Sequence, residues 1–326
     1  MVSGRQGPWR RAGEHLEAAM TMVDTPAKPV GVMELGDHLA LLYDNDEERR
    51  SVMAAYARDG VRAGHKIVYI SDGVTAAEVL AWLLAEGAAT GPGPQEDTPD
   101  LSEAMDAGHF IVRTAEETFL ASGRFDPAES IELIATEIDL ARVQGYRGVR
   151  ITGEARFSLR RWPGTERFGE FEQLLDDAFL TSDPTAMAVC QFDRRWFDDA
   201  RLAEVETRHM GRVRVNDYHD DGSLRITPIF NPPGAELAGT IDGSNLAAAE
   251  DVLASITTRT GLLCLDLSGL TGCDAAGLRL LTGAFGPGRR RGHGLLLRGV
   301  PPALHDRFRE EGLDGTPGIA VEYRPR

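Results

Sequence analysis

Residues 38–73, HLALLYDNDEERRSVMAAYARDGVRAGHKIVYISDG, contain the pattern that decides the fold. Two short apolar runs, at 38–43 and 66–71, flank an amphipathic stretch at 46–62. The runs are apolar at successive positions rather than at alternate ones, which predicts strands with both faces buried. A strand, a helix and a strand in this order predict a parallel sheet covered by helices.

The same alternation continues along the chain. Further apolar runs occupy 110–114, 148–153 and 187–192, with amphipathic stretches at 74–87, 127–144 and 166–180. The polar segment NDYHDDGS at 216–223 predicts a linker. Beyond it, two strand signals precede alternating helices and strands, which predicts a second α/β domain with a mixed sheet. We therefore expect a mobile extension at 1–33, a first domain at 34–215, the linker at 216–223 and a second domain at 224–326.

Length and charge limit the function classes. The 326 residues fit two domains better than one, and 42% hydrophobic residues suffice for buried cores. The net charge is −16, from 51 acidic and 35 basic residues. From residue 223 onward there are 11 of each, so the first 222 residues carry 51 − 11 = 40 acidic and 35 − 11 = 24 basic residues. Such an acidic chain argues against direct binding of nucleic acid.

Cysteine usage and hydropathy predict a cytoplasmic protein. The three cysteines are odd in number and lack the C-x-x-C spacing, which fits a reducing compartment. Apolar runs fall well short of the roughly 20 residues that cross a bilayer, so no membrane partner is expected.

Three blocks of the second domain carry a family resemblance. They read GTIDGSNLAAAEDVL at 239–253, LLCLDLSGLTGCDAAGLRLLTGAF at 262–285 and HGLLLRGVPPALHDRFREEGLDG at 293–315. Together they resemble a STAS domain, the module of bacterial anti-sigma factor antagonists, over about 224–323. The resemblance implies a protein partner, either an anti-sigma factor that is also a serine kinase or another STAS-containing protein.

The STAS family's phosphorylated loop is altered here. In the family it reads Asp-Ser-Xaa-Gly or similar, and phosphate on the Ser or Thr breaks contact with the partner by charge repulsion. Aligned on Asp274 and Gly277, the acceptor position is Ala275, so no phosphosite is expected there. Asp274, Ala275, Ala276 and Gly277 remain as a partner-binding loop, with Asp274 as a helix N-cap and Gly277 allowing close packing. A displaced phosphosite at Ser268, Thr271 or Thr282 is the alternative.

The first domain carries a second resemblance. Residues 38–73, MAVCQFDRRWF at 187–197 and His209 resemble the MEDS sensory domain over about 36–214, and residues 38–73 are also similar to RecA/KaiC-like ATPases. The resemblance implies a RecA-like parallel sheet. A P-loop needs G-x-x-x-x-G-K-[ST], but residues 44–51 read DNDEERRS, whose carboxylates would repel a triphosphate. We therefore expect no enzyme activity, with a weak nucleotide hydrolase as an alternative.

A ligand site is predicted at the carboxyl ends of the first domain's strands, where open parallel sheets bind ligands. The residues there are Tyr43, Asp44, Ser71, Asp72, Thr114, Glu154 and Asp193. The alternative interpretation is structural: Asp44 and Asp72 cap helices, and Glu154 is a solvated surface acid.

His38, Cys190 and His209 could supply metal ligands or a redox-sensing thiol if the fold brings them together. His38 begins a predicted strand and Cys190 lies inside one, so we favour a buried structural thiol and a satisfied histidine. The sequence therefore predicts neither a metal nor a cofactor.

These observations predict a non-enzymatic regulator of transcription. Its sensory domain would bind a small-molecule effector or a protein and change how the STAS domain engages its partner. The alternative is a scaffold protein, a homo-oligomer assembled through the STAS domain.

Overall fold

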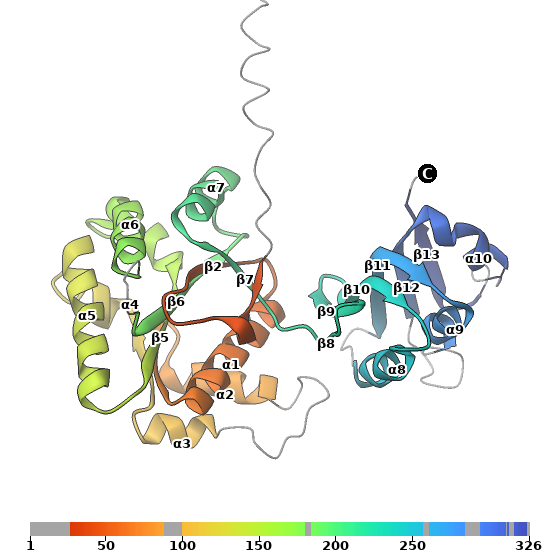
Figure 1. The fold of residues 1–326 in the computed structure, drawn as a ribbon. Coiled ribbons are helices and arrows are strands. Elements are labelled where there is room, and N and C mark those ends of the chain that lie inside the picture. Colours follow the sequence, from red (N-terminus) through yellow and green to blue (C-terminus); the bar gives the residue numbers. More distant parts are fainter. Residues whose placement is uncertain are drawn as a thin grey trace, which may run out of the picture.

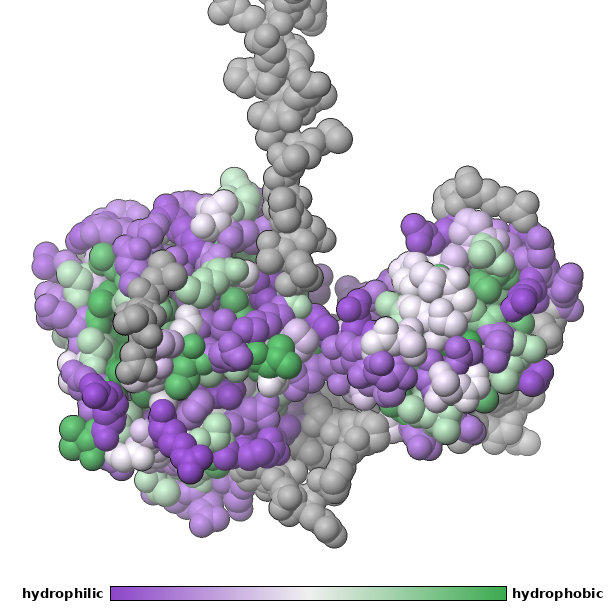
Figure 2. All heavy atoms as spheres, viewed as in Figure 1, coloured by the Kyte–Doolittle hydropathy of each residue, from purple (hydrophilic) through white to green (hydrophobic). Residues whose placement is uncertain are grey.

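The computed structural model describes residues 27–87, 100–179, 184–256, 261–283, 294–310, 312 and 316–324. They form two sheets in two domains (Figure 1). The segment between β7 (Gly211–Arg214) and β8 (His219–Asp220) leads from one domain to the other. Hydrophilic residues dominate the face of both domains seen in Figure 2, with smaller apolar patches between them.

The first sheet has seven strands in the order β1-β7-β2-β6-β5-β3-β4, and every pair is parallel. The predicted parallel sheet is therefore confirmed. Successive buried positions occur in its central strands, as the apolar runs require. The strands other than β7 are β1 (Lys28–Pro29), β2 (His38–Tyr43), β3 (His65–Ser71), β4 (Phe110–Thr114), β5 (Gly148–Glu154) and β6 (Ala186–Asp193).

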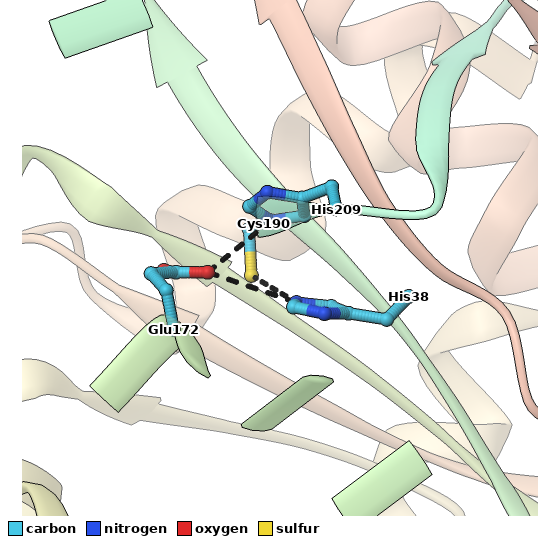
Figure 3. A group of neighbouring side chains, drawn as sticks. All are labelled: His38, Glu172, Cys190 and His209. Carbon is cyan, nitrogen blue, oxygen red and sulfur yellow. Dashed lines mark hydrogen bonds and ion pairs between the residues drawn. The ribbon is translucent and has the colours of Figure 1, made fainter. Parts of the chain in front are cut away.

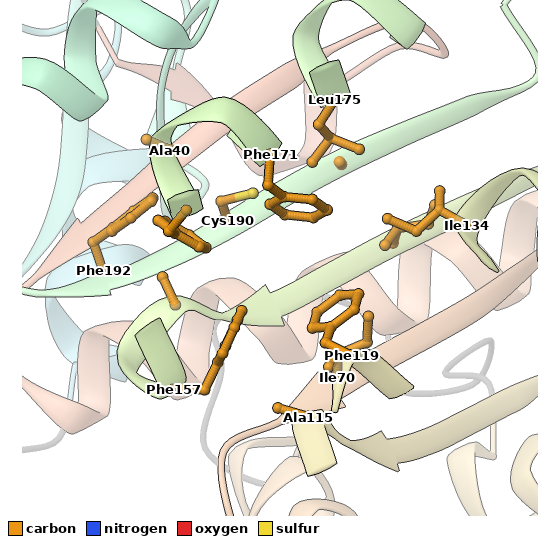
Figure 4. Close-up of a cluster of buried hydrophobic side chains, with 14 of the residues drawn as sticks. Ala40, Ile70, Ala115, Phe119, Ile134, Phe157, Phe171, Leu175, Cys190 and Phe192 are labelled. Atoms are coloured by element: carbon orange, nitrogen blue, oxygen red, sulfur yellow. The ribbon is translucent and has the colours of Figure 1, made fainter. Parts of the chain in front are cut away.

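Helices cover both faces of this sheet and close two apolar cores. One core packs α1 (Asp46–Ala63), α2 (Ala76–Gly87) and α3 (Leu101–Asp106) against the strands. The other packs α4 (Ala115–Phe119), α5 (Pro127–Val143), α6 (Phe168–Phe179) and α7 (Asp199–Arg208), and it is rich in phenylalanine (Figure 4). Short 3-10 turns lie at η2 (Val30–Val32), η4 (Ala155–Leu159) and η5 (Thr165–Arg167).

The helix α1 follows directly from the sequence. The side chain of Asn45 accepts a hydrogen bond from the Glu47 N–H and caps the helix. Gly64 ends it with a φ of 72°, a left-handed conformation that glycine adopts without strain. The chain therefore passes from α1 into β3 with a single turn residue.

The second sheet has six strands in the order β13-β12-β11-β10-β9-β8. Its pairs from β10 to β13 are parallel, and those from β8 to β10 are antiparallel, so the predicted mixed sheet is confirmed. The elements are β9 (Leu224–Phe230), β10 (Pro233–Ile241), α8 (Leu246–Ser255), β11 (Leu262–Cys273), α9 (Ala275–Gly283), β12 (Gly294–Val300), η6 (Pro302–Leu304), α10 (His305–Glu310) and β13 (Ile319–Tyr323). The helices α8, α9 and α10 and the 3-10 turn η6 contribute side chains to the core of this domain.

Two expected segment boundaries differ from the structure. The extension expected at 1–33 does not hold for its last part, because β1 pairs with β7 and Val30 is buried in the core; residues 1–26 lie outside the described residues. The expected linker contains β8, which pairs with β9 as an edge strand. None of the helices within the described ranges has the length and apolar character of a membrane span.

Candidate functional site

Four side chains from separate elements meet inside the first domain (Figure 3). They are buried, and each offers one metal-ligating atom within 4.8 Å of the others. Their elements are β2, α6, β6 and the end of α7. We call this group the His/Cys/Glu cluster: His38, Glu172, Cys190 and His209.

Sheet register explains how the cluster forms. β2 and β6 are neighbours, with Ala40 beside Cys190, so His38 and Cys190 lie on adjacent strands. The backbone N–H of Met210 donates to the carbonyl of His38, which holds the end of α7 beside β2. From the other side, the buried face of α6 presents Glu172. The sequence prediction named both histidines and the cysteine but missed the glutamate.

Distances inside the cluster are short. Nε2 of His209 lies 3.2 Å from Oε2 of Glu172, and Nε2 of His38 lies 3.7 Å from the same oxygen. The Sγ atom of Cys190 lies 3.5 Å from Nε2 of His38. The cluster therefore concentrates two imidazoles, a thiol and a carboxylate around one point.

The two histidines have opposite pKa shifts. Burial, and then the neighbouring His209, lower the pKa of His38 to about 3, although Glu172 opposes the shift. Burial also disfavours a charged His209, but contact with Glu172 outweighs this and raises its pKa. Burial and the Glu172 carboxylate raise the pKa of the Cys190 thiol well above its ordinary value.

His209 is buried and has partners at both ring nitrogens. Its Nδ1 atom lies 2.8 Å from the Val205 carbonyl oxygen, and its Nε2 atom lies 3.2 Å from Oε2 of Glu172. The other carboxylate oxygen of Glu172, Oε1, is buried without a hydrogen-bond partner in the described residues. Buried polar atoms of native proteins are normally hydrogen-bonded, so Oε1 of Glu172 requires an explanation.

Two hollows adjoin Glu172. One is an apolar cavity of about 30 Å³ that Phe119, Phe171 and Cys190 also line, and it has room for a water-sized guest. The other is a surface groove of about 370 Å³ between α6 and α7, bordered by Arg201 and Arg208. Glu172 therefore lies between the solvent-facing groove and the interior of the domain.

At the carboxyl edge of the first sheet, arginine side chains occupy the predicted ligand site. The Asp72 side chain is fully buried, and its oxygens lie 2.7 Å from Nε of Arg156 and 2.8 Å from an NH group of Arg160. Asp72 does not cap α2, because Thr75 and Glu78 form the hydrogen bonds at its first turn. The capping role expected for Asp72 is therefore wrong.

Glu154 is buried rather than solvated, which corrects the second part of that alternative. It accepts a hydrogen bond of 2.8 Å from the Tyr69 hydroxyl and one of 3.0 Å from Arg49. The Asp72 backbone N–H also donates to it, at 3.3 Å. Because β5 lies in the middle of the sheet, the strand's last side chain points into this network instead of into water.

The other predicted edge residues have separate local roles. Asp44 is exposed, and Asn45 caps α1 in its place. Ser71 donates to the Val74 carbonyl, and Thr114 caps α4 in a capping box with Glu117. Asp193 binds Arg195, while Tyr43 lies under the guanidinium of Arg49. The structure thus brings Asp72 and Glu154 together, whereas Ser71, Thr114 and Asp193 make separate local contacts.

In the second domain, the loop before α9 is a capped helix start. The Gly277 N–H donates to the Asp274 side chain at 2.7 Å, so the predicted N-cap is confirmed. A Cβ atom at Gly277 would come within 2.7 Å of Ile241, which confirms the close packing. Ala275 is exposed and Ala276 half-buried beside this cap.

Two of the three alternative acceptor hydroxyls, those of Ser268 and Thr271, lie on β11, and Thr282 belongs to α9. Thr271 donates to the Gly239 carbonyl at 3.1 Å, and the Ser268 N–H donates to Asp266. The side chain of Thr282 lies outside the described residues.

Comparison with protein families agrees with this architecture. The family model of the methanogen/methylotroph, DcmR sensory domain, abbreviated MEDS, matches residues 37–210, which is more than half of the chain. The chain belongs to the MEDS family. A STAS domain model, described as Mlab, matches residues 230–321, so a MEDS domain precedes a STAS domain. Both resemblances stated from the sequence are thereby confirmed, and the pair of domains indicates a signalling or regulatory protein.

Solved structures similar to this MEDS protein are distant. A KaiC-like protein from Pyrococcus horikoshii is 11% identical and has a TM-score of 0.39, with 60% of this chain and 79% of that chain covered. The flagellar accessory protein FlaH from Methanocaldococcus jannaschii is 8% identical with a TM-score of 0.37, with 64% and 80% covered. No curated protein matches the chain.

Proposed function

We propose that this MEDS–STAS protein is a non-enzymatic, cytoplasmic signalling regulator that controls transcription through protein–protein contacts. The MEDS domain would sense a small effector or a protein. The STAS domain would bind an anti-sigma factor of the serine-kinase class without being switched by phosphorylation. The two domains would be coupled if effector binding changed the affinity of the STAS domain for that partner.

The observation that carries the proposal is the exposed alanine at the start of α9. Ala275 occupies the acceptor position of the STAS loop, and a methyl group cannot accept a phosphoryl group. The Asp274 cap and the packing of Gly277 keep the helix start in place. These features support a docking surface that lacks its switch.

The proposal that the protein is not an enzyme is supported by the residues at the carboxyl edge of the first sheet. Asp72 and Glu154 are already paired with three arginines there, and no glycine-rich phosphate loop precedes α1. We expect phosphate release from Mg-ATP no faster than in buffer. A magnesium-dependent turnover that the Glu154→Gln substitution abolishes would contradict this expectation.

Docking at α9 can be tested with one substitution. Ala275→Arg places a large cation on the exposed helix start, and we expect it to weaken binding of a purified anti-sigma serine kinase by roughly tenfold or more, because it disturbs the centre of the contact. Titration calorimetry on the full chain measures the affinity. Ala320→Arg is the matched control, because Ala320 is also an exposed alanine, on β13. Ala320 pairs with Leu296 of β12, which pairs with Cys264 near the start of β11, whereas α9 follows the end of β11. Equal affinities of all three proteins, or no binding at all, would contradict the proposal.

A further inference from the structure

We propose that the His/Cys/Glu cluster is a binding site for a zinc-class divalent metal ion, with Nε2 of both histidines, Sγ of Cys190 and a carboxylate oxygen of Glu172 as ligands. All four residues lie in the MEDS domain, so this inference is independent of how the STAS domain acts. Imidazole, thiolate and carboxylate are the three ligand types that zinc takes in proteins.

The distances fit a tetrahedral ion. Zinc–ligand bonds of about 2.0–2.3 Å place neighbouring ligand atoms roughly 3.3–3.6 Å apart. The three separations inside the cluster, 3.2, 3.5 and 3.7 Å, bracket this range. All donor atoms lie within 4.8 Å of one another, so only a small contraction is needed to bind an ion at the centre.

The histidines are oriented for coordination by their other ring nitrogens. Nδ1 of His209 lies 2.8 Å from the Val205 carbonyl, which can only accept, so Nδ1 carries a proton and Nε2, 3.2 Å from Oε2 of Glu172, faces the other proposed ligands. Nδ1 of His38 lies 3.3 Å from Oδ1 of Asp176. Hydrogen bonds from a histidine to a backbone carbonyl or a carboxylate are the usual support of metal-binding histidines.

A metal ion would also neutralise the buried carboxylate. Oε2 of Glu172 lies 3.2 Å from Nε2 of His209, whereas Oε1 is buried without a hydrogen bond in the described part of the chain. A buried carboxylate with an unpaired oxygen is unfavourable, and a divalent cation bound through one of its oxygens would offset that charge. With four protein ligands the ion would have no open position, which is typical of a structural rather than a catalytic zinc site.

The groove between α6 and α7 borders the cluster at Glu172, whose side chain is 2% exposed. The cluster therefore combines a buried donor set with an outer shell.

The test uses the untagged full-length protein, freed of metal with a chelator under reducing conditions. With zinc added back, elemental analysis should find about one ion per chain, and cobalt should give the intense thiolate charge-transfer absorption of a cysteine-ligated ion. Cys190→Ser should abolish that absorption, and His209→Gln should weaken zinc binding by roughly 100-fold or more, beyond what loss of an outer-shell partner causes.

Cys264→Ser is the matched control, because Cys264 is also a buried free thiol but lies on β11 in the other domain. It should bind both metals like the unsubstituted protein. Absence of bound zinc, cobalt spectra without thiolate absorption, or equal binding by the Cys190→Ser variant would each overturn the proposal. The cobalt spectrum of the unsubstituted protein decides the matter even if a variant fails to fold.

Discussion

Zinc added to the metal-free protein should raise the unfolding midpoint of the MEDS domain by roughly 8–16 °C. A ligand that binds only the folded state stabilises it by about 4 kcal/mol at a concentration 1,000-fold above its dissociation constant. Each kcal/mol shifts the midpoint by about 2–4 °C in a domain of this size. The cluster forms only in the folded chain, because its residues come from β2, α6, β6 and the end of α7.

Differential scanning calorimetry measures this shift. Magnesium at the same concentration should leave the midpoint unchanged, since it prefers six oxygen ligands. The Cys190→Ser variant should lose the shift, and the Cys264→Ser variant should keep it. Identical midpoints with and without zinc would show that the cluster does not bind the ion in the folded protein.

Removing both arginines from Asp72 should destabilise the MEDS domain by about 3–5 kcal/mol, the loss typical when a buried charge loses its partner. The Asp72 side chain is fully buried, whereas those of Arg156 and Arg160 are 42% and 35% exposed. The double substitution Arg156→Met and Arg160→Met therefore leaves the carboxylate without a cation. Urea unfolding followed by tryptophan fluorescence gives the free energy of unfolding.

Two further variants separate lost pairing from lost packing. Adding Asp72→Asn to the double variant should recover most of the loss, because the buried charge is then gone. Glu116→Gln removes only the exposed partner of Arg160 and should change stability by less than about 1 kcal/mol. A double variant as stable as the unsubstituted protein would show that Asp72 does not need its arginines.

The strands of the MEDS domain could be predicted from the sequence because burial on both faces leaves an uninterrupted apolar run. The run at 38–43 coincides with β2. β11 is longer than its apolar run, because the chain stays extended through Gly269 and Gly272 beside β10. A Cβ atom at Gly269 would come within 2.8 Å of Ala238. Glycine here therefore allows β10 and β11 to lie close together, although glycines in a sequence are more typical of a loop.

Glu172 could have been found from the sequence, but only through helix periodicity. Phe168, Phe171, Leu175 and Phe179 form the buried face of α6, and Glu172 lies on that same face. A carboxylate on an apolar helix face is the signal, and it is hidden among the many acids of this chain. The meeting of α6 with β2 and β6 depends on tertiary packing, which spacing along the chain does not reveal.

The same reason explains the errors at the carboxyl edge. Glu154 ends a strand, and the alternative interpretation places it in water, but it meets Tyr69 from the neighbouring strand and Arg49 from α1. The partners of Asp72 come from η4 and the residue after it, more than 80 residues along the chain. Ion pairs between distant segments leave no pattern in a single sequence.

We propose that the STAS domain docks its partner without a phosphoryl switch. Incubation with a purified anti-sigma serine kinase and Mg-ATP, followed by intact-mass spectrometry and titration calorimetry, is the most direct test. We predict no added phosphate on the unsubstituted chain and equal affinity in ADP and in ATP, whereas Ala275→Ser gains a phosphate and loses affinity in ATP. Phosphate on the unsubstituted protein at Ser268 or Thr271, with loss of binding, would contradict the claim.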